Sequence, residues 1–146
     1  MTFALDLTEE QAAIKHAVEE ICAKYDDHYW LNVDNSGDFP DAFVNDIAEG
    51  GWLGVAMPES VGGAGLGLTE AAMMMQVVAA SGAGFSGASA IHLNIFGLMP
   101  IVKFGTPEQQ RRFLPPAING TDKACFAVTE PNSGLDTSSL ETRAER

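Results

Sequence analysis

The residues best suited to chemistry lie in one stretch near the C-terminal end of the chain, residues 126–136. The stretch begins with apolar and β-branched residues and then reaches Pro131 and Gly134, a pattern typical of a strand that breaks into a turn. Pro131 fixes its own φ, while Gly134 permits a positive φ and the close approach of a flat or anionic ligand. Thr129 supplies a hydroxyl donor and acceptor at the strand end. These residues fit a ligand-binding loop, although loop residues of these types more often form an ordinary turn.

Three other groups of residues could suggest chemistry, and a structural role explains each of them better. His28 follows two aspartates, but adjacent residues rarely converge on one ion, so no metal site is predicted. The four glycines within residues 62–67 lack the spacing of a dinucleotide loop and the lysine of a phosphate loop, so we expect a flexible bend. Cys22 and Cys125 have no metal-like spacing and lie in apolar surroundings, which favours buried thiols in a reducing compartment over a disulfide.

Helical periodicity and capping residues predict the elements that must position residues 126–136. A capping box at Thr8 and Gln11 opens the first expected helix, loops follow at residues 26–28 and 32–38, and a second helix runs from about Pro40 to Gly50. Thr69 is expected to cap a third helix, with Leu68 and Met73 as a hydrophobic staple, and residues 81–84 stop it. A fourth helix is expected over about residues 87–98, and a fifth begins at Thr106 and ends before Pro115. Three consecutive methionines, residues 73–75, are expected to fill gaps in the core. Residues 126–129 and 140–146 could form at most two strands, with no sheet to join.

Composition narrows the class of protein. The chain of 146 residues has 46% hydrophobic and 19% charged residues, which is typical of a globular domain. Its formal charge of −12 is concentrated in residues 1–100, which hold two lysines and fourteen carboxylates, so a nucleic-acid partner is disfavoured. Charges and glycines interrupt the apolar runs, so no transmembrane helix is predicted. The first seven residues resemble neither a secretory signal nor a transit peptide, and the expected location is cytoplasmic.

The order of residues in the 126–136 stretch resembles the first signature of the flavin-dependent acyl-CoA dehydrogenases. The matching pattern is Ala-Val-Thr-Glu at residues 127–130, then Ser-Gly at 133–134, Asp at 136 and Ser at 139. The resemblance implies that Phe126, Val128 and Thr129 face the flavin of FAD, with the Thr129 hydroxyl and nearby amides bonded to its ring. It also implies that Gly134 and Leu135 lie where the flavin and CoA arms meet. The family usually has Ser or Thr where this chain has Leu135, so the resemblance supports only a backbone contact to CoA there.

Two further stretches are similar to the same family, and together the three cover essentially the whole chain. Residues 103–120 contain the family's Gly, Gln and aromatic-Leu pattern just before the flavin strand, and Met57-Pro58 with Gly62-Gly63 is similar to its Pro and Gly-Gly loop. In the family the helix that matches residues 87–98 forms part of the acyl pocket. By that analogy Ser89, His92 and Phe96 could line a pocket wall. A hydrogen-bonded, partly buried histidine explains His92 better, however, and Phe96 could equally be a core residue.

The resemblance implies a mainly α fold, in which residues 1–121 form the N-terminal helical bundle of the acyl-CoA dehydrogenase fold and residues 122–146 form the truncated start of a β domain. It implies an FAD-dependent enzyme that converts an acyl-CoA to the 2-enoyl-CoA, passes electrons to an acceptor and assembles as a tetramer when complete. The catalytic Glu of the family lies in its C-terminal domain, so no catalytic residue is expected in this chain, and Glu130 is expected to be structural. The alternative is a non-catalytic helical interaction module derived from the same family.

Overall fold

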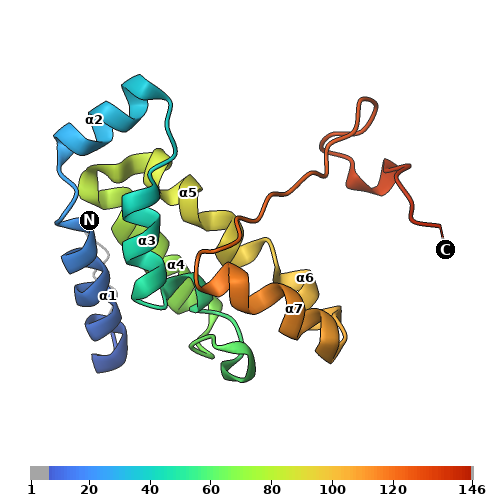
Figure 1. Cartoon of the computed structure of the whole chain (residues 1–146), viewed down its shortest axis with the longest axis horizontal. Coiled ribbons are helices and arrows are strands. Elements are labelled where there is room, and N and C mark those ends of the chain that lie inside the picture. Colours follow the sequence, from blue (N-terminus) through green and yellow to red (C-terminus); the bar gives the residue numbers. More distant parts are fainter. Residues whose placement is uncertain (1–6, 146) are drawn as a thin grey trace.

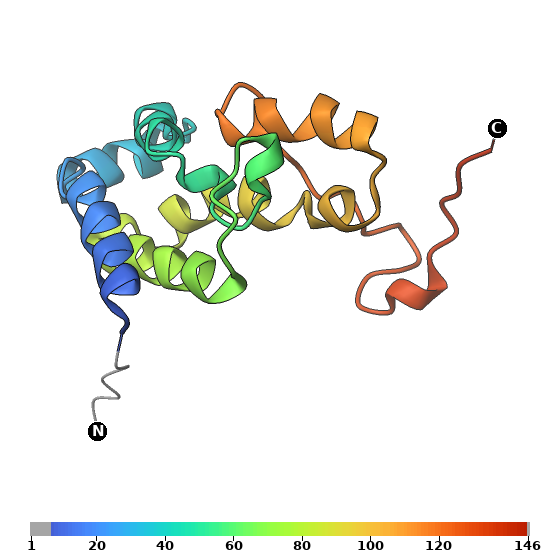
Figure 2. The same cartoon turned by 90° about the horizontal axis from the view of Figure 1, so that it is seen from below.

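The computed structural model describes residues 7–145, which fold into a helical body (residues 7–121) followed by a C-terminal segment (residues 122–145). Within this range the chain forms seven α-helices and no strand. The helices are α1 (Glu9–Cys22), α2 (Asp27–Ser36), α3 (Asp41–Glu49), α4 (Leu68–Val78), α5 (Gly84–Phe96), α6 (Met99–Phe104) and α7 (Pro107–Ile118). Figures 1 and 2 show the helices gathered in one body and the C-terminal segment leaving it beyond α7. The expected mainly α fold is therefore confirmed.

The main core lies where α1, α3, α4 and α5 meet. Helix α1 packs on α3 and α4, and α4 packs on α5. The residues that share this core are fully or almost fully buried, and the largest of the fully buried ones are Phe43, Ile47, Leu53, Met74, Ile91 and Ile95. Met74 is completely buried and Met73 nearly so, which confirms the central position expected for this methionine-rich helix.

A second, smaller core joins α7 to the turns that follow α3. Met57, Val61, Leu114 and Ile118 form it, and residues of α6 pack around them. Helix α7 begins at Pro107 with the expected capping box, in which Thr106 and Gln109 each accept from the other's backbone amide. The helix does not end before Pro115. It continues to Ile118, because its last turns bury Leu114 and Ile118 against this core and the carbonyl of Pro115 still accepts from Asn119.

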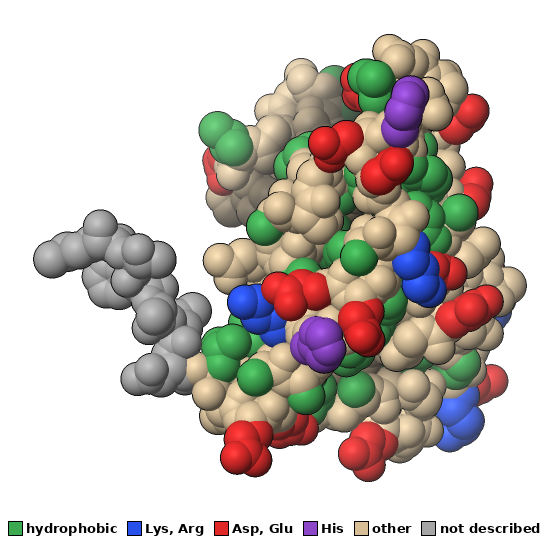
Figure 3. All heavy atoms as spheres, turned by 90° about the vertical axis from the view of Figure 1, so that its left-hand side faces the viewer, with side chains coloured by type: hydrophobic (Ala, Val, Ile, Leu, Met, Phe, Trp, Pro, Cys, Tyr) green, Lys and Arg blue, Asp and Glu red, His purple; other side chains and the backbone are tan. Residues whose placement is uncertain are grey.

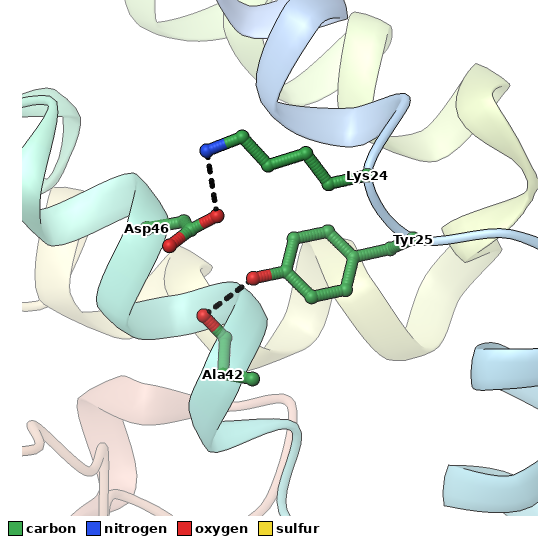
Figure 4. Close-up of polar contacts among 4 residues, drawn as sticks. All are labelled: Lys24, Tyr25, Ala42 and Asp46. Atoms are coloured by element: carbon green, nitrogen blue, oxygen red, sulfur yellow. Dashed lines mark hydrogen bonds and ion pairs between the residues drawn. The ribbon is translucent and has the colours of Figure 1, made fainter.

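Polar side chains at the edge of the main core form hydrogen bonds between the segment that follows α1 and helix α3. Lys24 Nζ lies 2.9 Å from Asp46 Oδ2, and the Tyr25 hydroxyl donates to the carbonyl of Ala42 at 2.7 Å (Figure 4). Burial and the neighbouring Asp46 carboxylate raise the pKa of Tyr25 well above its ordinary value, so the phenol stays protonated and continues to donate. These contacts fix the end of α1 on α3.

Helix α2 is the largest departure from the expected pattern, since residues 26–28 and 32–38 were expected in loops and the helix includes residues 27–28 and 32–36. The Asp26 side chain accepts from the amide of Tyr29 and caps the helix, and Gly37 ends it at φ +72°. Trp30 is buried on the body and stacks edge-on against Phe43 with ring centroids 5.1 Å apart. One buried anchor between two good caps is therefore enough to form a helix in a polar sequence.

Smaller corrections concern helix ends. Helix α4 begins at Leu68 with Gly67 as its cap, because the carboxylate of Glu70 accepts from the Gly67 amide at 3.0 Å. Thr69 therefore does not cap this helix. Leu68 is exposed and does not form the expected hydrophobic staple with Met73. Helix α5 begins at Gly84, three residues earlier than expected, after a π-helical turn at Ala79–Ala83. The capping box at the start of α1 is confirmed. Residues 1–6 and Arg146, which were part of the expected N-terminus and second strand, lie outside the described residues.

One helical run, Leu68–Phe104, is by length and composition alone apolar enough to cross a membrane, since it has 37 residues and contains an 18-residue window with a mean hydropathy of 1.4. Core helices of soluble proteins share these properties. Gly82 and Gly84 have positive φ values of 97° and 55°, and they divide the run into separate helices. Both α4 and α5 contribute buried residues to the main core.

Candidate functional site

The stretch expected to face the flavin lies in the C-terminal segment and extends away from the helices (Figure 1). Residues 126–129 are not in a strand, because the described part of the chain provides no neighbouring strand to pair with them. Phe126 is 64% exposed, Thr129 is exposed and Val128 is half-buried. Cys125 is also exposed, which corrects the expectation of a buried thiol there, whereas Cys22 is buried as expected.

The backbone of this stretch is free to bind. Within residues 7–145, none of the amides of residues 125–129 has a hydrogen-bond partner, and the Thr129 hydroxyl has none either. Free amides next to an aromatic and an aliphatic side chain can hold a flat heterocycle, since the side chains cover its face and the amides bond its edge. The residues present therefore fit one wall of a flavin site.

A tight turn follows this stretch. Glu130 and Ser133 exchange both backbone hydrogen bonds, at 2.8 and 3.2 Å. The Ser133 side chain is buried, and its hydroxyl donates to the carbonyl of Asp136 at 2.6 Å. Gly134 does not have a positive φ, although glycine would permit one, and a Cβ added there would meet no atom within 4 Å. Leu135 beside it is fully exposed. The Gly134 backbone is therefore open to the close approach of a ligand.

Two carboxylates hold the C-terminal segment together by accepting from its own backbone and hydroxyls. Glu130 accepts from the amides of Glu141 and Thr142 at 2.9 and 2.8 Å, and the bond from Glu141 is the main cause that lowers the pKa of Glu130. Asp136 accepts from the hydroxyls of Ser138 and Ser139, which lower its pKa. A general base near neutral pH needs a raised pKa, so Glu130 is built as a structural clasp.

The residues expected to form an acyl-pocket wall share one side of α5. His92 is exposed and Phe96 is half-buried, and their ring centroids lie 5.4 Å apart. Ser89 is exposed and borders a shallow cavity of about 460 Å³ together with Phe85 and Val33. The structure thus places the three residues along one helix, with Phe96 packed against the main core.

One polar residue of α5 was missed by the sequence analysis. Asn94 is only 5% exposed, and its side chain makes three hydrogen bonds at the point where the C-terminal segment leaves the body. A single amide between the buried residues Ile91 and Ile95 of an apolar helix was the signal that could have found it, since a buried amide requires partners.

The glycine-rich residues 62–67 form a packed turn and not a flexible bend. The amides of Ala64, Gly65 and Leu66 donate to the carbonyls of residues 54, 57 and 55, so they cannot cradle a phosphate. A Cβ on Gly63 would lie 2.2 Å from the carbonyl oxygen of Met57. The glycines of this turn therefore serve close packing.

A larger cavity of about 720 Å³ lies between α1 and α4, apart from the C-terminal segment. Its lining includes Lys15, Glu19, Cys22, Met73 and Val77. Burial raises the pKa of the Cys22 thiol, so this cysteine is a poor nucleophile. The surface around α1 and α2 is rich in carboxylates and poor in basic residues (Figure 3), as the distribution of charge in the sequence requires.

Comparison with known proteins agrees with this arrangement. Residues 8–121 match the model of the family described as acyl-CoA dehydrogenase, N-terminal domain. The chain belongs to the acyl-CoA dehydrogenase family. It is 33% identical over 141 residues to the probable acyl-CoA dehydrogenase YngJ of Bacillus subtilis, an alignment that covers 95% of this chain and 36% of that protein. It is also 33% identical to the benzylmalonyl-CoA dehydrogenase of Aromatoleum aromaticum, over 97% of this chain and 37% of the relative.

A solved structure shows the same fold. A chain in the structure described as the electron transferring flavoprotein of Acidaminococcus fermentans superimposes with a TM-score of 0.81 at 28% identity, covering 95% of this chain and 36% of that chain. This chain therefore spans a little over one third of the length of these relatives. The alignments to acyl-CoA dehydrogenases cover most of both the helical body and the C-terminal segment, whereas the family model ends at residue 121.

Proposed function

We propose that this chain supplies the N-terminal part of an FAD-dependent acyl-CoA dehydrogenase, which converts an acyl-CoA thioester to the 2-enoyl-CoA. One observation carries the proposal. Immediately after a helical body that matches the family, residues 126–129 present exposed apolar side chains and free backbone amides in one extended stretch. Such a stretch is costly for a chain to leave uncovered, and a flavin ring satisfies both its apolar and its polar groups.

In this proposal each residue of the stretch has a separate task. Phe126 and Val128 cover the flavin face, while the Thr129 hydroxyl and the nearby amides donate to its edge. FAD, when bound, accepts the hydride from the β-carbon of the substrate. Hydrogen bonds from fixed backbone groups orient the ring with little loss of side-chain entropy, because the backbone is already ordered at both ends, by Asn94 and by the clasp at Glu130.

The substrate side of the proposal involves the turn and α5. Gly134 and Leu135 lie at the exposed tip of the turn, where the open backbone of Gly134 permits close approach of a CoA arm. His92 and Phe96 form one wall of the acyl pocket. The carboxylate that removes the α-proton comes from outside residues 1–146, since Glu130 is committed to Glu141 and Thr142 and has a lowered pKa.

The same proposal includes the domain boundaries of the chain, its electron acceptor, its oligomeric state and its location in the cell. Residues 1–121 form the N-terminal helical domain, and residues 122–146 begin the middle β domain. The complete protein uses a separate electron acceptor, assembles as a homo-oligomer of the tetrameric type and acts in the cytoplasm.

A non-catalytic interaction module is the second candidate, and a different observation favours it. Phe85 and Phe104 are 86% and 85% exposed and lie on α5 and α6, away from residues 126–129. Large exposed aromatic side chains are typical of surfaces that bind another protein. This candidate predicts a partner protein but no bound flavin and no turnover.

Thioester oxidation by the protein purified from its source separates the two candidates. The enzyme proposal predicts that acyl-CoA thioesters bleach the flavin band and reduce an artificial electron acceptor, with 2-enoyl-CoA as the product. A matched preparation that carries Thr129→Ala controls for adventitious flavin, because it removes one proposed donor and leaves the helical body intact. Protein that carries no flavin and leaves every thioester unchanged would overturn the enzyme proposal and favour the interaction module.

A further inference from the structure

Asn94 joins the helical body to the C-terminal segment through a buried side chain. It lies on the core side of α5 between Ile91 and Ile95, both of which are completely buried. An amide in such surroundings destabilises the fold unless its donors and acceptor are satisfied. Asn94 meets this condition with partners that come entirely from outside its own helix.

The hydrogen-bond partners of Asn94 are three backbone groups that follow one another along the chain where it leaves the helical body. Its Nδ2 group donates to the carbonyl of Ala117 in the last turn of α7 and to the carbonyl of Asp122, each at 2.9 Å. Its Oδ1 atom accepts from the amide of Ala124, also at 2.9 Å. One side chain therefore fixes the end of α7, the connecting turn and the start of the C-terminal segment together.

The geometry assigns Asn94 the role of a positioning residue that sets how residues 126–129 stand relative to α5. The Ala124 amide donates to Asn94, and only Cys125 separates Ala124 from Phe126. The direction of the chain at Ala124 therefore determines the position of Phe126, the first residue of the proposed flavin wall. The same helix carries His92 and Phe96, so Asn94 also links the proposed acyl-pocket wall to the proposed flavin wall. The flavin part of this inference rests on the proposed function.

A second contact at the same turn provides a matched control. Lys123 Nζ lies 2.7 Å from Asp41 Oδ1 and 3.8 Å from the centre of the Phe39 ring, and both ends of this ion pair are more than half exposed. Exposed ion pairs contribute little to stability, so the buried amide and not this pair is expected to hold the turn.

Amide hydrogen exchange on this chain tests the anchor without any flavin. In Asn94→Ala we expect the Ala124 amide to exchange at least ~10-fold faster, while the amides of α1 and α4 keep their protection. Asn94→Asp keeps the acceptor for the Ala124 amide but puts a carboxylate oxygen against the carbonyls of Ala117 and Asp122, so it is expected to speed exchange at Ala124 as well. Lys123→Ala is expected to leave the Ala124 rate within about twofold of wild type. An unchanged Ala124 rate in Asn94→Ala, or an equal effect of Lys123→Ala, would overturn the anchor.

Flavin affinity of the protein purified in its natural length tests the positioning role. In Asn94→Ala we expect the FAD dissociation constant to rise about tenfold and the shape of the flavin absorption band to change, with helix content unaltered in circular dichroism; Lys123→Ala should change neither. Faster exchange at Ala124 with unaltered FAD affinity and spectrum would show a structural anchor only and overturn the positioning role. Wild-type protein without FAD affinity would overturn the proposed function and this role, while the exchange rates would still decide whether Asn94 anchors the segment.

Discussion

The helical body and the C-terminal segment differ in what becomes of their apolar side chains and in how their hydrogen-bonding groups find partners. In the body, apolar side chains are buried between α1, α3, α4 and α5, and the backbone amides bond within helices. In the segment, the carboxylates of Glu130 and Asp136 bond to nearby amides and hydroxyls, while Phe126 and Leu135 face solvent. The difference teaches that the body has a hydrophobic core of its own, whereas the segment is ordered by local hydrogen bonds and leaves apolar side chains open to a ligand.

Matched leucine truncations in the two regions should give the largest difference in stability. Leu114 of α7 is completely buried, so Leu114→Ala should lower the free energy of unfolding by about 3 kcal/mol, through lost burial and a new cavity. Leu135 is fully exposed, so Leu135→Ala should change it by less than about 0.5 kcal/mol. Urea unfolding followed by circular dichroism measures both values. Equal losses would show that the segment has a core of its own and would remove the contrast.

Matched glycine substitutions test the same contrast through the backbone. Gly63→Ala would place a Cβ 2.2 Å from the Met57 carbonyl oxygen, so we expect a loss of about 2 kcal/mol from the forced shift of the turn. Gly134→Ala meets open space and a permitted φ, so we expect no loss of stability. Thermal unfolding of the two variants gives the comparison. In the complete enzyme, Gly134→Ala should instead raise KM for the acyl-CoA, and an unchanged KM would argue against a CoA contact at this turn.

Matched threonine substitutions separate a structural hydroxyl from a binding hydroxyl. Thr106 caps α7 by accepting from the Gln109 amide, so Thr106→Ala should cost about 1 kcal/mol of stability. The Thr129 hydroxyl has no partner within the described residues, so Thr129→Ala should leave the unfolding midpoint unchanged and weaken FAD binding by the flavin-containing protein. Chemical unfolding and flavin fluorescence supply the two readouts. A lower midpoint in Thr129→Ala would mean that this hydroxyl belongs to the fold.

Protonation of Glu130 in acid should weaken its hydrogen bonds to the amides of Glu141 and Thr142. This is the smallest of the expected effects. Because the folded pKa of Glu130 lies below its ordinary value of 4.5, the stabilisation from the clasp is fully present above that pH and is lost as the pH falls through the lowered pKa. We expect the amide resonances of Glu141 and Thr142 to shift in that acidic range, and Glu130→Gln to abolish the shift. A shift centred above pH 5 would contradict the lowered pKa.

Local sequence signals predicted the parts of the fold that depend on neighbouring residues. The capping boxes at Thr8 and Thr106 were found because their partners lie three residues away. Helix α2 was missed because its stability comes from Trp30 packing on Phe43 of another helix. The prolines in α7 were read as a stop, although buried neighbours on the same helix outweigh their cost.

The candidate site was predictable only in part for the same reason. The residue order at 126–136 indicated a flavin-contacting stretch, but sequence could not show that Asn94, thirty residues from Ala124, holds that stretch in place. Glycine at position 134 permits both a positive φ and the close approach of a ligand, and only the structure shows that Gly134 leaves open space without a positive φ. The strand expected at residues 126–129 needs a partner strand, which the described residues do not contain.

The intact mass and flavin content of the protein purified from its source test the central claim most directly. This chain has a mass of 15.5 kDa and spans about 36% of its relatives. The account predicts a native protein close to the length of those relatives that carries one FAD per chain. A native protein of 15.5 kDa that carries no flavin would contradict it.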